Sequence, residues 1–123
     1  MDQVHMVRYK LIIFTPLILV QGKVYRASDL IYGDDVAVKI EPKSTVPSVL
    51  MHEYHVLCQL KGITGIPRAH WFGYEAGNNT LILDYLGPSL EDVFNACHRS
   101  FQLSTIALIA DQLVSLLNNA FII

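Results

Sequence analysis

The turn-forming run Gly77-Asn78-Asn79 stands between two helical segments, and it constrains the fold more than any other feature of the chain. The apolar stretches on either side of it predict two strands, near Ala69–Tyr74 and Thr80–Tyr85, that are joined as a hairpin. A hairpin pairs its strands in antiparallel fashion, which argues against a doubly wound α/β fold. The sequence therefore predicts an α+β fold, in which a helix packs on an antiparallel sheet.

The other elements are predicted from hydrophobic periodicity and from turn residues. Strands are expected early in the chain, and helices before and after the hairpin. The expected elements are strands within Arg8–Tyr32 that are broken at Pro16 and near Ser28-Asp29, a strand over Val36–Glu41, a helix over Ser48–Leu60 that is stopped by Gly62, a helix from Ser89 to about Cys97, and a helix from about Ser104 to Leu117.

Bulk properties narrow the class of protein. The chain has 123 residues, which suits one domain. Its formal net charge is −2 and its basic residues are scattered, so no nucleic-acid partner is expected. The apolar run Leu11–Val20 is shorter than the roughly 20 residues that a membrane-spanning helix needs. We interpret it as a buried strand or two short strands and expect no membrane partner, with membrane association as the minor alternative.

Cysteine and histidine residues give no metal-binding pattern. Cys58 and Cys97 lie far apart in helical patterns, which favours buried or idle thiols over a disulfide or a metal site. His52 and His55 flank Glu53, and we interpret them as surface positions of a helix. No metal site is therefore predicted.

Glu53 is an acidic residue at a position where the sequence pattern predicts a buried side chain. It falls within the apolar stripe of the predicted helix over Ser48–Leu60, and a carboxylate that faces a core costs several kcal/mol unless it is paired. Lys39 is the natural partner, because on its strand it shares a face with Ala37. The sequence predicts a Lys39–Glu53 ion pair between strand and helix. The alternative, equally supported by the pattern, is a slightly rotated helix with Glu53 solvated at its edge.

Two shorter motifs carry weaker information. Ser89 precedes Asp92 by three residues, which is the spacing of a capping box and requires no function. An acid in the first turn of a helix can also act as a ligand. Gly22-Lys23-Val24-Tyr25 is similar to the end of a glycine-rich loop that binds phosphate through backbone N–H groups.

Together these residues resemble a protein kinase. Val36-Ala37-Val38-Lys39 resembles the Val-Ala-Ile-Lys motif of kinases, and Glu53 resembles the acid of the kinase C-helix. Further segments are similar to one branch, the casein kinase I family, and the resemblance covers about Gly22–Leu117. These segments are Ile40-Glu41-Pro42-Lys43, Gly62-Ile63-Thr64-Gly65-Ile66-Pro67, Leu86-Gly87-Pro88-Ser89-Leu90-Glu91-Asp92-Val93-Phe94 and Ala110-Asp111-Gln112-Leu113.

The resemblance implies one partial kinase domain over residues 1–123. A small lobe, with an antiparallel sheet and one C-helix, would span about 8–85, and the hinge exit and first two helices of the large lobe would span 86–123. The family transfers phosphate from ATP, with Mg²⁺, to Ser or Thr of protein substrates inside the cell, in the cytoplasm or nucleus. In that scheme Lys39 would bind the α- and β-phosphates, Glu53 would orient it, and Gly22 would belong to the phosphate loop.

The resemblance also assigns the adenine and ribose contacts. Val24 and Ala37 would pack on the adenine, and Leu83 would be the gatekeeper residue. The hinge Asp84-Tyr85-Leu86 would hydrogen-bond the adenine edge through its backbone, and Asp92 would approach the ribose.

The sequence departs from the family at two places. Leu17 and Leu19 occupy the positions of the first two loop glycines, and their side chains would hinder a close approach of phosphate. No His-Arg-Asp or Asp-Phe-Gly motif occurs in the 123 residues, so no catalytic residue is assigned and no phosphoryl transfer is expected of this chain alone.

These departures leave alternatives to catalysis. One is ATP binding without transfer. The other is a degenerate kinase lobe that serves as a protein-interaction or regulatory module. The apolar stripe of the helix over Ser104–Leu117 is buried in the family, so here we expect it to be exposed unless a protein partner covers it.

Overall fold

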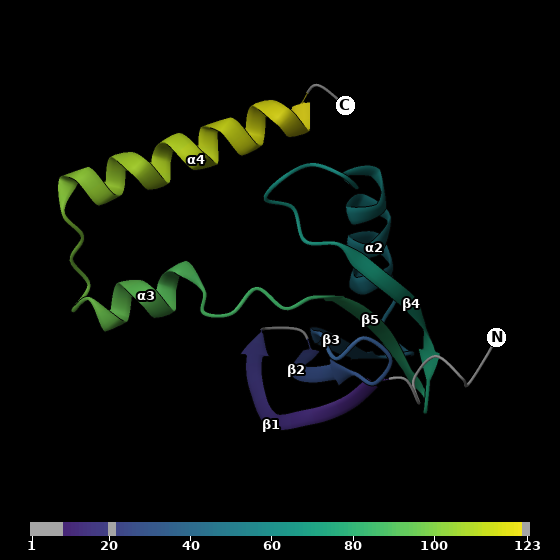
Figure 1. Cartoon of the computed structure of the whole chain (residues 1–123). Helices are drawn as coiled ribbons and strands as arrows, with labels where there is room; N and C mark the ends of the chain where they lie inside the picture. The colour runs from purple at the N-terminus through teal and green to yellow at the C-terminus, as the bar shows by residue number, and fades with distance from the viewer. Residues whose placement is uncertain (1–8, 20–21, 122–123) are drawn as a thin grey trace. The chain divides into compact units, whose positions relative to one another are not determined.

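The computed structural model describes residues 9–19 and 22–121 and has an α+β fold. Its strands form one antiparallel sheet in the order β1-β2-β3-β5-β4, as Figure 1 shows. Helix α2 follows β3 in the chain and contacts β3, β4 and β5. The prediction of an antiparallel sheet with one packed helix is confirmed. The elements are β1 (Tyr9–Leu19), β2 (Gly22–Asp29), β3 (Asp35–Pro42), α2 (Val49–Gln59), β4 (Ala69–Glu75), β5 (Asn78–Asp84), α3 (Leu90–Ala96) and α4 (Leu103–Phe121).

The chain divides into two compact units. The first unit consists of residues 1–61 and 67–85 and holds the sheet with α2. The second unit consists of residues 62–66 and 86–123 and holds α3 and α4. The division after Tyr85 falls where the sequence analysis places the end of the small lobe.

The core of the first unit lies on both faces of the sheet, and β3 shows why. Val36 and Val38 are buried in a cluster on one face with Ala27 and Ile82. Ala37 points to the other face and packs against a second cluster, formed by Leu50, Leu81 and Leu83. We call these the outer cluster and the helix-side cluster. The alternation of side chains along a strand therefore places Lys39 on the same face as α2.

The hairpin between β4 and β5 turns at different residues from those expected. The turn is made by Ala76 and Gly77, whose φ angles are +47° and +77°, and Glu75 pairs directly with Asn78. Positive φ at both central residues is typical of a type I′ turn. The Asn78 side chain donates a hydrogen bond to the Ala76 carbonyl at 3.2 Å. Strand β5 therefore starts at Asn78, because the tighter turn leaves both asparagines free to pair in the ladder.

The break expected at Pro16 does not end a strand. Strand β1 runs from Tyr9 to Leu19 and pairs with β2, with register shifts between Leu11 and Ile13 and between Ile13 and Leu17. Proline has no N–H group to donate to a ladder and is tolerated on edge strands and at irregularities. Pro16 lies within such an irregularity on an edge strand, so the strand continues past it.

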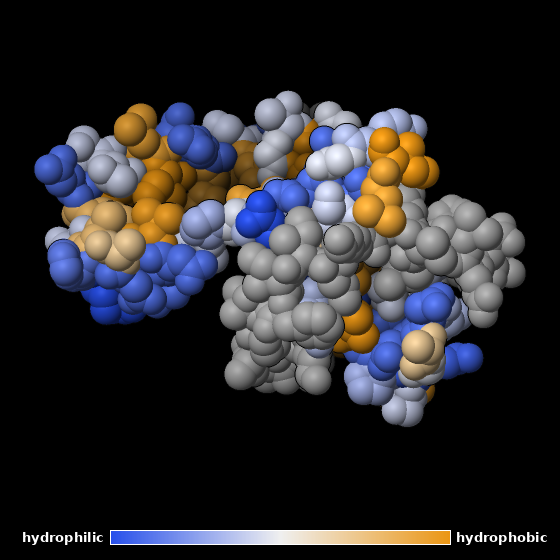
Figure 2. Space-filling view, turned by 60° about the horizontal axis from the view of Figure 1, so that its bottom comes forward, coloured by the Kyte–Doolittle hydropathy of each residue, from blue (hydrophilic) through white to orange (hydrophobic). Residues whose placement is uncertain are grey.

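Helix α4 exposes the apolar residues that the sequence analysis singled out. It is longer than expected at both ends, and none of its described residues is buried. Ile106, Leu113 and Leu117 are 48%, 50% and 56% exposed. Figure 2 shows hydrophobic residues gathered on the surface of the part that holds α3 and α4. Within the described residues, neither α4 nor any other helix combines the length and apolar character needed to cross a membrane.

Candidate functional site

The predicted ion pair between Lys39 and Glu53 is present. Lys39 Nζ donates a hydrogen bond to Glu53 Oε1 at 2.6 Å, joining β3 to α2. The two side chains are 23% and 31% exposed, so the pair is partly shielded from water. This geometry excludes the alternative in which Glu53 is solvated at the helix edge without a partner.

The position of α2 follows from local sequence. Ser48 is the N-cap residue, and its hydroxyl accepts a hydrogen bond from the Met51 N–H at 3.1 Å. Leu50 is buried, while Tyr54 and Leu57 pack against the helix-side cluster. This apolar face fixes the rotation of α2 and directs Glu53 toward β3.

Three further predicted site residues lie on the same face of the sheet as Lys39. Val24 on β2 is the direct cross-strand partner of Lys39, and Ala37 is the partner of Leu83 on β5. Directly opposed residues of an antiparallel pair project from one face. Val24 and Ala37 are half-buried, and Leu83 is buried in the helix-side cluster. The sheet thus brings a cation, its acidic partner and an apolar surface together.

The segment expected to bind phosphate is a strand hairpin. Gly22 is the first residue of β2 and pairs with Leu19, the last residue of β1. Leu17 pairs with Val24, so the ladder includes both positions where the family has its first two glycines. Residues 20 and 21, which connect these two strands in the sequence, lie outside the described residues.

The predicted hinge spans the end of β5 and the start of the second unit. Tyr85 is 41% exposed and carries the guanidinium of Arg26 over its ring, 4.7 Å from the ring centroid. Arg26 also forms an ion pair with Asp35 on β3. Leu86 is 71% exposed and belongs to the second unit.

Asp92 completes the capping box predicted at the start of α3. Its Oδ2 accepts hydrogen bonds from the Ser89 N–H and hydroxyl, both at 2.8 Å, and its N–H donates to Ser89 Oγ at 3.1 Å. The bonds from the Ser89 N–H and hydroxyl hold the pKa of the Asp92 carboxyl below its usual value. Asp92 lies in the second unit and has the capping role that needs no ligand.

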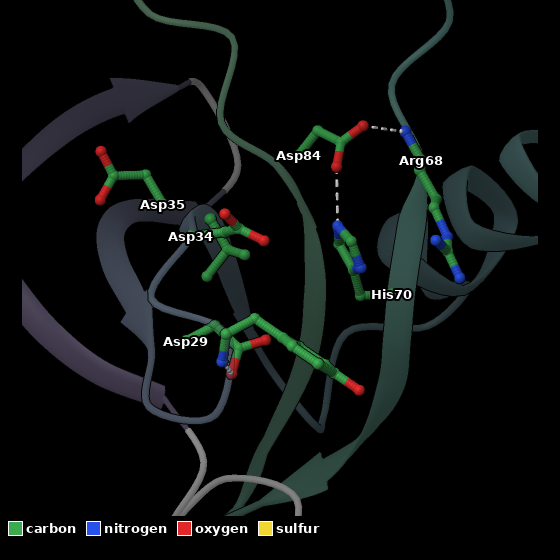
Figure 3. A pocket seen from close by; sticks show the side chains of 8 residues that line it. Asp29, Asp34, Asp35, Arg68, His70 and Asp84 are labelled. Atoms are coloured by element: carbon green, nitrogen blue, oxygen red, sulfur yellow. Dashed lines mark hydrogen bonds and ion pairs between the residues drawn. The ribbon is translucent and has the colours of Figure 1, made fainter.

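A polar hollow of about 500 Å³ opens on the other face of the sheet from Lys39. Asp84 and Val36 are cross-strand partners, so both project toward the outer-cluster face. Figure 3 shows the side chains that line the hollow. They come from the end of β2, the β2–β3 turn, the start of β3, the residue before β4, β4 itself and the end of β5. They are Asp29, Tyr32, Asp34, Asp35, Val36, Arg68, His70 and Asp84.

Asp84 is held by two contacts in this hollow. Its Oδ2 accepts the Arg68 N–H at 2.8 Å, and its Oδ1 lies 2.7 Å from His70 Nε2. Partial burial acts to raise the pKa of Asp84, but the bond from the Arg68 N–H and the pairing with His70 outweigh it and lower the pKa. The His70–Asp84 pair was not predicted. Register shifts between Ala69 and Trp71, so period-two alternation does not reveal which face His70 uses.

The described residues contain no group of three or more His, Cys, Asp or Glu side chains that could hold a metal ion. Cys58 and Cys97 are free thiols, as expected, but both are exposed, which corrects the interpretation of a buried thiol. Cys97 ends α3, a helix without buried residues, and Cys58 lies on the solvent side of α2. His52 and His55 are exposed on α2, as predicted.

Compared with models of known protein families, the chain matches none.

Proposed function

We propose that this chain binds ATP as the nucleotide-binding part of a casein kinase I-like serine/threonine protein kinase. The observation that carries the proposal is the Lys39–Glu53 ion pair of 2.6 Å between β3 and α2. Protein kinases use a lysine on the third strand and a glutamate on the C-helix in this way. The sequence motifs around Lys39 and after Tyr85 support the same family.

The face of the sheet around Lys39 suits a nucleotide. Lys39 supplies a cation for the α- and β-phosphates, and Glu53 orients it while leaving two ammonium protons for ligand oxygens. Val24 and Ala37 offer a half-buried apolar surface for the adenine. The resemblance assigns the hydrogen bonds to the adenine edge to the backbone of Asp84, Tyr85 and Leu86, and it assigns the ribose contact to Asp92.

The proposed role of these residues is nucleotide binding rather than phosphoryl transfer. The 123 residues contain no His-Arg-Asp or Asp-Phe-Gly motif to supply a catalytic base or a ligand for Mg²⁺. The family activity, transfer of the γ-phosphate to protein Ser or Thr within the cell, belongs in this proposal to a polypeptide that carries those motifs.

The test is competitive displacement of a fluorescent ATP analogue by ATP, ADP and adenosine. We expect ATP and ADP to bind more tightly than adenosine, because only they reach Lys39 with phosphate. Lys39→Met removes a charge-assisted hydrogen bond worth about 1.5–3 kcal/mol, so ATP affinity should fall roughly 10- to 150-fold toward that of adenosine.

Lys61→Met is the matched control, because Lys61 is exposed just beyond the end of α2. It should leave all three affinities unchanged. Equal affinities for ATP and adenosine in the unmodified chain, or an unchanged ATP affinity in Lys39→Met, would contradict the proposal.

The exposed apolar face of α4 favours a second candidate, a non-catalytic protein-interaction or regulatory module. Leu113 and Leu117 are half-exposed although they lie on the apolar stripe. This candidate predicts that Leu113→Asp with Leu117→Asp abolishes association measured by light scattering and leaves ATP affinity unchanged. A monodisperse monomer before and after the substitution would count against a second copy of the chain as the partner.

A further inference from the structure

A buried polar cluster joins the N-terminus of α2 to the sheet. Glu41 on β3 and Asn79 on β5 are each 2% exposed and are direct cross-strand partners. Asn79 Nδ2 donates to Glu41 Oε1 at 2.9 Å and to Ser48 Oγ at 3.3 Å. The Ser48 hydroxyl donates to Glu41 Oε1 and accepts from the Met51 N–H. A single carboxylate oxygen therefore binds both the sheet and the cap of α2.

This cluster gives α2 a second attachment to β3. Lys39 contacts Glu53, and Glu41, two residues further along the strand, contacts Ser48. Two residues span about 7 Å of strand. The five residues from Ser48 to Glu53 span roughly 7.5 Å of helix. The two spacings match, so both contacts form together when the helix runs antiparallel to β3.

Two contacts at different points along β3 fix both the position and the orientation of α2, which a single contact does not. With the Lys39–Glu53 contact alone, α2 can pivot about that point or shift along the strand with a change of lysine rotamer. The Ser48–Glu41 contact holds the N-cap residue of the helix at Glu41, so the position of α2 along β3 is set. Glu53 is then already positioned next to Lys39, so less conformational entropy is lost when the ion pair forms.

The buried position of the Glu41 carboxyl group is unfavourable for the stability of the fold. Its Oε2 is buried without a hydrogen-bond partner among the described residues, and the same holds for Asn79 Oδ1. Among the described residues, Glu41 accepts hydrogen bonds from Ser48 and Asn79, and no basic side chain is ion-paired with it. A buried polar atom without a hydrogen-bond partner destabilises a fold, so what this side chain contributes lies in the geometry that Oε1 fixes.

We propose that Glu41 is a positioning residue, which holds α2 through Ser48 so that Glu53 reaches Lys39. This inference deepens the proposed function and rests on it for its second readout, because in that function the Lys39–Glu53 pair sets the affinity for the phosphates of a nucleotide. Glu41 does not touch the nucleotide. Its effect on binding passes through α2.

The first readout requires no nucleotide. Chemical denaturation of the single and double variants gives the coupling free energy between Lys39→Met and Glu53→Gln, which is the difference between the double variant's change in unfolding free energy and the sum of the two single changes. The cycle is measured in the unmodified chain, in Glu41→Gln and in Glu41→Ala. In the Glu41→Gln background the coupling should be retained, because the amide oxygen still accepts from Ser48 and Asn79. In the Glu41→Ala background the coupling should be lost. An unchanged coupling in Glu41→Ala would overturn the proposal.

The second readout is the ratio of ATP to adenosine affinity. Glu41→Ala should reduce this ratio while adenosine affinity stays constant, and Glu41→Gln should restore it. A loss of both affinities together would indicate a merely structural role and would overturn the proposal. If the unmodified chain binds neither ligand, the proposed function fails, and the coupling measured without nucleotide still decides the role of Glu41.

A second variant guards against a Glu41→Ala chain that does not fold. Ser48→Asp keeps a residue that caps helices well but sets a carboxylate against Glu41. It should lose the coupling and retain the helix content measured by circular dichroism. Ser44→Asp, in the exposed turn before α2, is the matched control and should change neither. An unchanged coupling free energy between Lys39→Met and Glu53→Gln in the Ser48→Asp background would contradict the proposed role of the Ser48–Glu41 contact.

Discussion

The two units of the chain use hydrophobic residues in opposite ways. Within the described residues, every buried hydrophobic side chain belongs to the first unit, on one face of the sheet or the other. In the second unit, α3 and α4 have no buried residue, although α4 carries a clear apolar stripe. The difference teaches that periodicity identifies the face of an element that can be buried and leaves open what buries it.

The physical reason lies in how each unit can close a core. Side chains of neighbouring strands pack side by side on each face of the sheet, and α2 adds a layer that covers Leu81 and Leu83. A helix such as α4 cannot bury its own stripe, and most of the stability of a helix in a protein comes from packing that stripe against another element. The two units should therefore respond differently to equivalent substitutions.

The largest expected effect comes from deleting equivalent side chains in the two units. Leu81 is fully buried in the helix-side cluster, while Leu113 on α4 is 50% exposed. Leu81→Ala should lower the free energy of unfolding by about 2–5 kcal/mol, because it removes apolar contacts and leaves a cavity. Leu113→Ala should change it by no more than about 0.5 kcal/mol. Urea denaturation followed by circular dichroism measures both, and similar losses would refute the contrast between the units.

A smaller effect is expected from the two serine N-caps. Ser48 caps α2 in the first unit, and Ser89 caps α3 in the second. Ser48→Ala should destabilise the first unit by about 0.5–2 kcal/mol, since it removes the bond to the Met51 N–H as well as the bond to Glu41. Ser89→Ala should accelerate amide hydrogen exchange in α3 and leave the unfolding midpoint of the first unit unchanged. A shift of that midpoint by Ser89→Ala would mean that the two units unfold together.

Some contacts of the first unit could be predicted from the sequence and others could not. The sequence pattern named Lys39 as the partner of Glu53 but supported a solvated Glu53 equally well, because the periodicity of α2 does not fix the rotation of the helix to within one residue; the structure shows the pair. The turn at Ala76-Gly77 was misplaced because Ala76 takes a positive φ, which alanine rarely does, next to asparagines that are better turn formers.

Two features of the first unit carried no sequence signal. The hollow around Asp84 depends on register irregularities in β4, which shift the faces of a strand without any marker residue. The attachment of Glu41 to Ser48 joins a strand to a loop residue seven positions later, and no periodicity covers such a contact. In both cases the missing information is register, which tertiary packing supplies.

The smallest expected effect concerns two carboxyl groups whose pKa values are lowered for different reasons, one in each unit. The pKa of Asp92 is lowered by the N–H and hydroxyl of Ser89. In Asp84, burial raises the pKa, but the bond from the Arg68 N–H and the pairing with His70 together lower it below 3.8. Carbon-13 NMR titration of the aspartate carboxyl groups measures both.

Because the folded state lowers the pKa of Asp84, ionised Asp84 stabilises the first unit above about pH 4, its ordinary range, and this contribution is lost as the pH falls through the folded-state pKa. Asp84→Asn should therefore destabilise the unit at neutral pH, by a small amount since the Asp84 side chain is 43% exposed, and the difference should vanish in acid. His70→Ala should raise the pKa of Asp84 only part of the way, because the Arg68 N–H remains, and should leave Asp92 unmoved. A parallel shift of both carboxyl groups would show that a change common to both units, rather than the two local sets of hydrogen bonds, sets their pKa values.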